Sequence, residues 1–190
     1  MKRSILIASL ALTLIYQGLA SAEKAPSPQE EILSNLEKSL PSDPKERFFK
    51  LSEVAAAAFD AGDYDKAETY ANELLSEASN YRTNWNYGNA VYSGNLMLGR
   101  IALKRDNNVS QAESYLIAAG KTPGSPQLDS FGPSMTLAKE MLVAGERDAV
   151  LAFLDECGNF WKTGADTLNE WKKTIRNGET PNFGSNMNYH

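Results

Sequence analysis

The chain has 190 residues, with 24 acidic and 19 basic side chains and a net charge of −5 at pH 7. This length favours a single domain with one buried core. The acidic balance disfavours nucleic acid as a partner, because affinity for phosphates comes mainly from Lys and Arg. Cys157 is the only cysteine and His190, the last residue, the only histidine. These counts exclude an intrachain disulfide and leave no well-held base for Ser–His–Asp or Cys–His catalysis, so we expect no catalytic residue, metal or cofactor.

Residues 1–22 have the pattern of a secretory signal peptide. Lys2 and Arg3 precede an apolar run, and small residues follow at Ala20-Ser21-Ala22. We expect cleavage after Ala22 and export to the periplasm or the cell exterior, with an uncleaved membrane anchor as the alternative. The apolar run is shorter than the ~20 residues that span a bilayer, so we expect no membrane span after cleavage. Loss of Lys2 and Arg3 changes the net charge from −5 to −7, since residues 1–22 contain no acid.

The rest of the chain predicts helices joined by short turns. Ser27-Pro28-Gln29-Glu30 and Asp43-Pro44 are helix-start signals, and Gly62 followed by Asp63 is typical of one helix ending and the next beginning. No segment alternates as a strand does. We therefore predict an all-α fold of about seven to eight helices in stacked antiparallel hairpins, at about 28–39, 44–61, 64–78, 83–104, 109–119, 133–144, 147–161 and 165–176. Residues 23–43 form a leader and N-terminal helix, residues 44–176 the helical domain, and residues 177–190 a flexible tail.

The stretch Gln127-Leu-Asp-Ser-Phe-Gly-Pro-Ser-Met135 places an acid and two hydroxyl groups between two predicted helices. A catalytic interpretation requires a base beside Ser130 or Ser134, and none is visible. We interpret the stretch as a helix start, with Pro133 at the first helical position and Phe131 packed back onto the helix.

Two turns of the chain are similar to each other. Ala61-Gly62-Asp63 is followed by Ala67, and Ala144-Gly145-Glu146 by Val150. Self-similar helical hairpins are typical of repeat architectures. Residues 44–161 resemble the tetratricopeptide repeat family, with Gly62, Tyr64 and Ala67 at its turn spacing and Leu98-Gly99 in a second copy. Counting the turn at Asn107 between them, the turns at Gly62, Asn107 and Gly145 are 45 and 38 residues apart. Both intervals exceed the family's repeat of roughly 34 residues, which implies longer helices.

The resemblance implies a groove lined by the first helix of each hairpin, where a protein or peptide partner binds. The positions that map to this groove are Phe49, Ser52, Phe59, Ser93, Leu96, Arg100, Met135 and Lys139. The family's carboxylate clamp expects Asn where this chain has Ala56 and Lys where it has Ser52. The resemblance therefore implies an apolar or extended peptide segment as the ligand, not a C-terminal carboxylate.

Arg100 and Lys139 are the two cations among the groove candidates, and they leave two interpretations open. Either they meet an anionic group of the partner, or each pairs with a neighbouring acid such as Glu140 or Asp106.

A second candidate surface lies in the aromatic and amide-rich segment 80–92. Tyr81, Trp85, Tyr87 and Tyr92 alternate there with asparagines at 80, 84, 86 and 89. Their spacing does not place all four rings on one helix face. One interpretation puts Trp85 and Tyr92 in the core and Tyr87 at a helix seam. The other makes the segment a surface for a peptide or a sugar.

The remaining conspicuous residues carry no catalytic pattern. Cys157 shares a helix stripe with Phe153 and Phe160, so we expect it in the core. The acids that could serve acid–base chemistry are Glu30, Glu31, Glu68, Asp155 and Glu156, and nothing pairs them across a cleft. We predict an exported, non-catalytic adaptor or scaffold that binds a protein partner. The alternatives are a carboxylate enzyme acting on cell-envelope glycan and a subunit that only assembles with itself or a partner.

Overall fold

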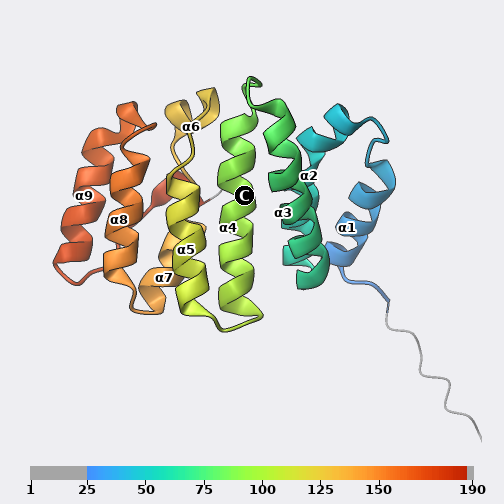
Figure 1. The fold of residues 1–190 in the computed structure, drawn as a ribbon. Helices are drawn as coiled ribbons and strands as arrows, with labels where there is room; N and C mark the ends of the chain where they lie inside the picture. The colour runs from blue at the N-terminus through green and yellow to red at the C-terminus, as the bar shows by residue number, and fades with distance from the viewer. Residues whose placement is uncertain (1–24, 188–190) are drawn as a thin grey trace, which may run out of the picture.

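The computed structural model describes residues 25–187, and every regular element in that range is helical (Figure 1). The α-helices are α1 (Pro28–Ser39), α2 (Pro44–Asp60), α3 (Tyr64–Ala78), α4 (Tyr87–Lys104), α5 (Val109–Gly120), α6 (Pro126–Phe131), α7 (Thr136–Val143), α8 (Arg147–Cys157) and α9 (Ala165–Arg176). Short 3₁₀ turns lie at η1 (Ser79–Tyr81), η2 (Lys162–Gly164) and η3 (Gly184–Met187). The all-α prediction is confirmed. The predicted signal peptide and His190 lie outside the described residues.

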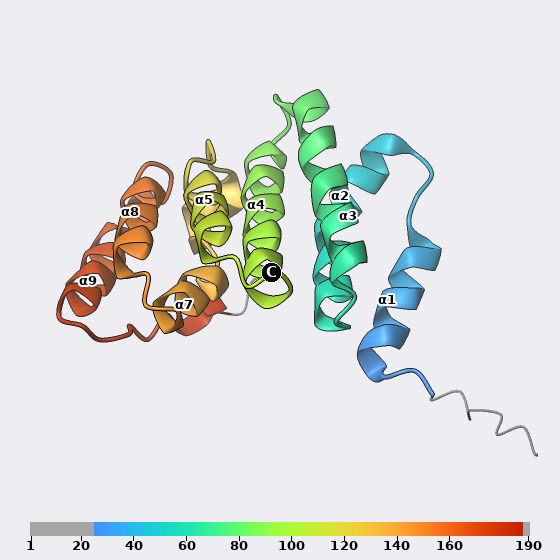
Figure 2. The same ribbon diagram turned by 60° about the horizontal axis from the view of Figure 1, so that its bottom comes forward.

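Most helices lie side by side in a row (Figure 1). Each of α2 to α5 packs on the next, α5 then packs on α8, and α8 packs on α9. The short helices α6 and α7 both contact α4, and in Figure 1 α6 lies at the top of the row and α7 at the bottom. At the other end of the row α1 contacts α2 but is inclined away from it (Figure 2). Between residues 25 and 187, no helix is both long and apolar enough to cross a membrane.

The helix ends follow the local signals in the sequence. Ser27 and Glu30 form a capping box at α1, and Asp43 accepts hydrogen bonds from the N–H groups of Lys45 and Glu46 at α2. Gly62 has a φ of +79°, and the Asp63 side chain caps α3. These three helix starts are confirmed, because each depends only on residues within one turn of the chain.

The core runs the length of the row. Phe48, Leu51 and Val54 of α2 are fully buried, as are Phe153 and Leu154 of α8. Cys157 is buried beside them, as predicted, and burial raises the pKa of its thiol well above the ordinary value. A thiol held in this protonated state is not a nucleophile at neutral pH.

The prediction that Pro133 begins a helix is wrong. The chain forms the extra helix α6 within the predicted loop, because Ser125 caps it and Pro126 occupies its first turn. Gly132 ends α6 with a φ of +81°, and α7 begins only at Thr136. Phe131, which we expect to pack back onto the new helix, is 59% exposed.

Two other predicted helices are shorter than expected. The helix expected from residue 83 begins at Tyr87, after the η1 turn. Asn84 Oδ1 accepts the N–H of Asn86 at 2.9 Å, a local bond that competes with helix formation. The helix expected to reach residue 161 ends at Cys157.

The described part of the predicted flexible tail is packed against the domain. Phe183 is only 3% exposed and meets the Trp171 ring edge-on, with 5.0 Å between ring centroids. Asn186 Nδ2 donates to the carbonyl oxygens of Phe131 and Pro133, at 3.1 and 2.9 Å. The Asn186 carbonyl accepts the N–H of Met135. Residues 177–187 therefore hold the connection between α6 and α7 in place.

Candidate functional site

Two pockets meet at Ser52 of α2. The first, here called the α4–α6 pocket, has a volume of about 380 Å³ and is lined by Ser52, Leu74, Asn86, Asn89, Ala90, Tyr92, Ser93, Gln127, Leu128, Phe131, Gly132 and Ser134. The second, the α1–α2 pocket, has a volume of about 490 Å³ and is lined by Gln29, Ile32, Leu36, Ser52, Glu53, Ala56, Ala57 and Asp60. Both volumes are in the range of ligand sites. Ser52 lines both, so the two pockets adjoin at α2, and we refer to the pair as the groove across α2.

A hydrogen-bond network of amides forms one wall of the α4–α6 pocket. Asn89 Nδ2 donates to Asn86 Oδ1 at 2.9 Å and to Gln127 Oε1 at 2.7 Å, so Asn89 connects α4 to α6. Asn89 Oδ1 in turn accepts the hydroxyl of Ser125, whose oxygen also caps α6 by accepting the N–H of Leu128. The N-terminal cap of α6 therefore also orients the three amides.

The other wall of this pocket is aromatic. Phe131 exposes more than half of its side chain at the rim, whereas Tyr92 is buried and donates its hydroxyl to the Ser134 carbonyl. Burial raises the pKa of Tyr92 well above its ordinary value, so the ring stays neutral. Among residues 25–187, those that line the α4–α6 pocket are thus all neutral.

The α1–α2 pocket is more apolar, with two acids at its edge. Ile32 is 54% exposed there, although it is a large aliphatic residue. Glu53 forms an ion pair with Lys50 at 3.1 Å, and Asp60 is exposed. Helix α1, which supplies one wall, is attached to α3 by Glu37, which pairs with Lys66 at 2.9 Å and accepts the Tyr70 hydroxyl at 2.8 Å.

The structure brings together part of the predicted groove. Ser52 and Ser93 line the α4–α6 pocket, and Leu96 and Arg100 line a small cavity of about 10 Å³ that also borders both serines. Phe59, Leu96 and Met135 are buried in the core. Phe49 is half-buried, and Lys139 is exposed on α7 beside a separate pocket at the far end of α4.

Arg100 has partners within the chain. Its guanidinium lies 3.3 Å from Glu140 of α7 and stacks over the Phe59 ring, 4.2 Å from the centroid. The Arg100 side chain is only 13% exposed. Of the two interpretations from the sequence, the structure therefore has the one in which Arg100 pairs with a neighbouring acid, here Glu140. Arg100 does not supply a free positive charge to the groove.

The aromatic segment does not form one surface. Tyr81 stacks on Phe48, with ring centroids 4.6 Å apart, and Tyr92 is in the core. Trp85 is 52% exposed and stacks on Phe49, so its expected core position is wrong. Tyr87 is half-buried and packs against the cluster around Phe48. The residues of this segment that line the groove are Asn86, Asn89, Ala90 and Tyr92.

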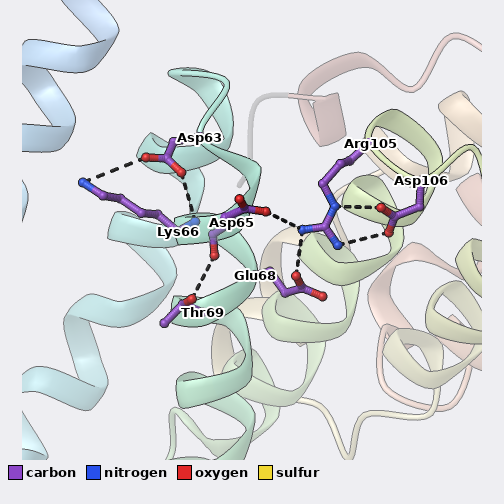
Figure 3. A network of polar contacts seen from close by, with 7 residues as sticks. All are labelled: Asp63, Asp65, Lys66, Glu68, Thr69, Arg105 and Asp106. Atoms are coloured by element: carbon purple, nitrogen blue, oxygen red, sulfur yellow. Dashed lines mark hydrogen bonds and ion pairs between the residues drawn. The ribbon is translucent and has the colours of Figure 1, made fainter.

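Figure 3 shows a polar cluster that the sequence analysis missed. Arg105 donates to Asp65 and Glu68 of α3, at 3.0 and 2.7 Å, and to Asp106 beside it. The carboxylates of Asp106 and Glu68 raise the pKa of Arg105, and Arg105 lowers the pKa of Asp106. The cluster ties the first turns of α3 to the turn between α4 and α5. Glu68 and Asp65 precede Arg105 by 37 and 40 residues in the sequence, so no local pattern relates them to Arg105.

The acids considered for catalysis lie away from the groove's α4–α6 pocket. Glu30 caps α1, Glu68 binds Arg105, Asp155 pairs with Lys172, and Glu156 accepts from Asn159. The arrangement at the α4–α6 pocket can donate hydrogen bonds to a ligand and bury an apolar group.

In comparisons with family models, curated proteins and solved structures, nothing matches this chain.

Proposed function

We propose that this protein is an exported, non-catalytic adaptor or scaffold that resembles the tetratricopeptide repeat family and binds an extended segment of a protein partner. The proposal combines the export pattern of residues 1–22 with the groove across α2. Stacked hairpins of the solenoid type would present α2 and α4 as the first helices of successive repeats, and these two helices supply Ser52 and Ser93.

The observation that carries the proposal is the meeting of the two pockets at Ser52. A ligand that occupies both pockets extends from α1 across α2 to α4 and α6. Neighbouring helices are about 8–10 Å apart, so this path is roughly 16–20 Å long. An extended chain covers it with about five or six residues at ~3.3 Å each. An extended peptide fits these dimensions better than a compact small molecule does.

The lining also disfavours the enzyme alternative. General acid–base hydrolysis of a glycan needs two carboxyl groups about 5–10 Å apart across the bound bond. In the described part of the chain, no carboxylate lines the α4–α6 pocket, and of the two acids in the α1–α2 pocket, Glu53 and Asp60, the first is already paired with Lys50.

Site-specific photo-crosslinking in the native cells tests the proposal. A benzophenone amino acid at Ser93, in the groove, is expected to crosslink the partner through one short segment of its chain. The same group at Ser76, which is exposed on α3, serves as the control and is expected to give no such product. Equal products from the two positions would contradict a groove site. A crosslink from Ser93 to a second copy of this protein would favour the assembly alternative.

A further inference from the structure

The amides of the α4–α6 pocket leave their donor groups available to a ligand. Asn86 Oδ1 and Gln127 Oε1 both accept from Asn89, which fixes the two side chains. Within residues 25–187, neither Asn86 Nδ2 nor Gln127 Nε2 donates a hydrogen bond. An amide nitrogen carries two donors and no acceptor. The pocket therefore presents oriented N–H groups beside the exposed ring of Phe131.

A ligand for such a wall must supply acceptors. A peptide carbonyl is an acceptor only, so it matches an amide NH₂, and the N–H of the same trans peptide group points the opposite way, away from the wall. A sugar hydroxyl brings its donor on the same oxygen as its acceptor, and the oxygens of Asn86 and Gln127 each already accept one hydrogen bond from Asn89. The chemistry of the wall thus favours a polypeptide backbone over a neutral sugar.

The charges of the groove favour a segment without acids. The lining of the α4–α6 pocket is neutral, Arg100 is held by Glu140, and the groove's other end carries Glu53 and Asp60. The N-terminus of α4 lies at the pocket and would favour an anion by about 0.3–1 kcal/mol. Taking an unpaired carboxylate out of water costs several kcal/mol. The described residues of the lining supply no cation to offset desolvation, so the pocket disfavours an acidic side chain.

We propose that the α4–α6 pocket selects a segment without acidic side chains, binding its backbone carbonyl oxygens through Asn86 and Gln127 and an apolar side chain against Phe131. This inference rests on the proposed function, because it names the chemistry of the segment that the groove would take. It assigns to Gln127 a role that the sequence alone did not indicate, and it selects Asn86 from the candidate surface in residues 80–92.

Selection from a random peptide display library on the purified protein tests the inference. We expect the bound peptides to be enriched in apolar residues and depleted in Asp and Glu. A synthetic copy of a selected peptide is then measured against Asn86→Asp combined with Gln127→Glu. These changes keep the oxygens that Asn89 uses but remove the donors, and an acid is favourable in the first turn of a helix. Affinity is expected to fall about tenfold or more, with an unchanged melting curve.

Asn72→Asp, the same change on the exposed surface of α3, is the control and is expected to leave the affinity unchanged. If no selected peptide loses affinity on Ser52→Arg, which obstructs the groove, the proposed function fails and the inference fails with it. If groove-dependent peptides are rich in acids, or bind the double variant as well as the parent, the inference is wrong and the proposed function stands. Binding of a neutral oligosaccharide that depends on Asn86, in place of peptides, would also overturn the inference.

Discussion

Phe183→Ala is expected to lower the free energy of unfolding by about 3–5 kcal/mol, the usual cost of removing a buried aromatic side chain. Phe183 is almost fully buried against Trp171, so the smaller side chain leaves a cavity at the end of the core. Denaturant unfolding of the variant and the parent measures the difference.

Thr180→Ala provides the matched control, because Thr180 lies in the same C-terminal segment and is exposed. We expect it to change the stability by less than about 0.5 kcal/mol, as for most surface substitutions. If both variants unfold with the parent, residues 177–187 are the flexible tail that the sequence predicts, and they do not support the connection between α6 and α7.

Gly88→Ala is expected to destabilise the protein by about 1–3 kcal/mol or more, the range for forcing atoms into a packed region. A Cβ atom at Gly88 would lie 1.7 Å from the carbonyl oxygen of Gly124, a backbone atom that cannot rotate away. Thr122 Oγ1 also donates to the Gly88 carbonyl at 2.7 Å and holds this loop against α4. Moving the loop would displace Ser125 and disturb the amide network of the pocket. Thermal or denaturant unfolding measures the loss.

The direction of the stability change is informative, because helix propensity alone predicts that Gly88→Ala stabilises the protein. Alanine is better than glycine inside a helix by about 1 kcal/mol. In Gly94→Ala, a comparison within α4, the new Cβ meets the side chain of Leu75, which can shift, so we expect a smaller loss. Stabilisation by Gly88→Ala would mean that the loop does not approach α4 as closely as described.

The predictable parts of the fold depend on neighbouring residues. The starts of α1, α2 and α3 follow from caps and prolines within four residues of each helix. Helix α6 has a signal of the same kind in Ser125-Pro126, although the sequence prediction places a loop there. A helix of six residues has too little periodicity to separate it from a loop.

The parts that were not predicted depend on distant partners. Asn186 bonds to carbonyls 53 and 55 residues earlier in the chain, and Arg100 to an acid 40 residues later. A polar C-terminal segment rich in Asn and Gly has no apolar stripe, so its composition resembles that of a free tail. Only the fold shows that Phe183 and Asn186 have a surface to pack on.

The candidate site also has residues that could be predicted from the sequence and residues that could not. Of the groove positions that the resemblance implies, Ser52 and Ser93 line the same pocket. Three other positions, Phe59, Leu96 and Met135, are in the core instead. Gln127 and Phe131 were missed as lining residues, since they reach the groove only through α6.

Binding of a partner segment in the groove is tested most directly by its affinity for the Ser52→Arg variant. Ser52 lines both pockets, so a long side chain at this position obstructs the whole path. We predict that the segment identified by crosslinking binds Ser52→Arg at least about tenfold more weakly than the parent. Ser76→Arg adds the same charge on the exposed face of α3 and should bind as the parent does. Equal affinities for the parent and both variants, with all three folded, would contradict a binding site in this groove.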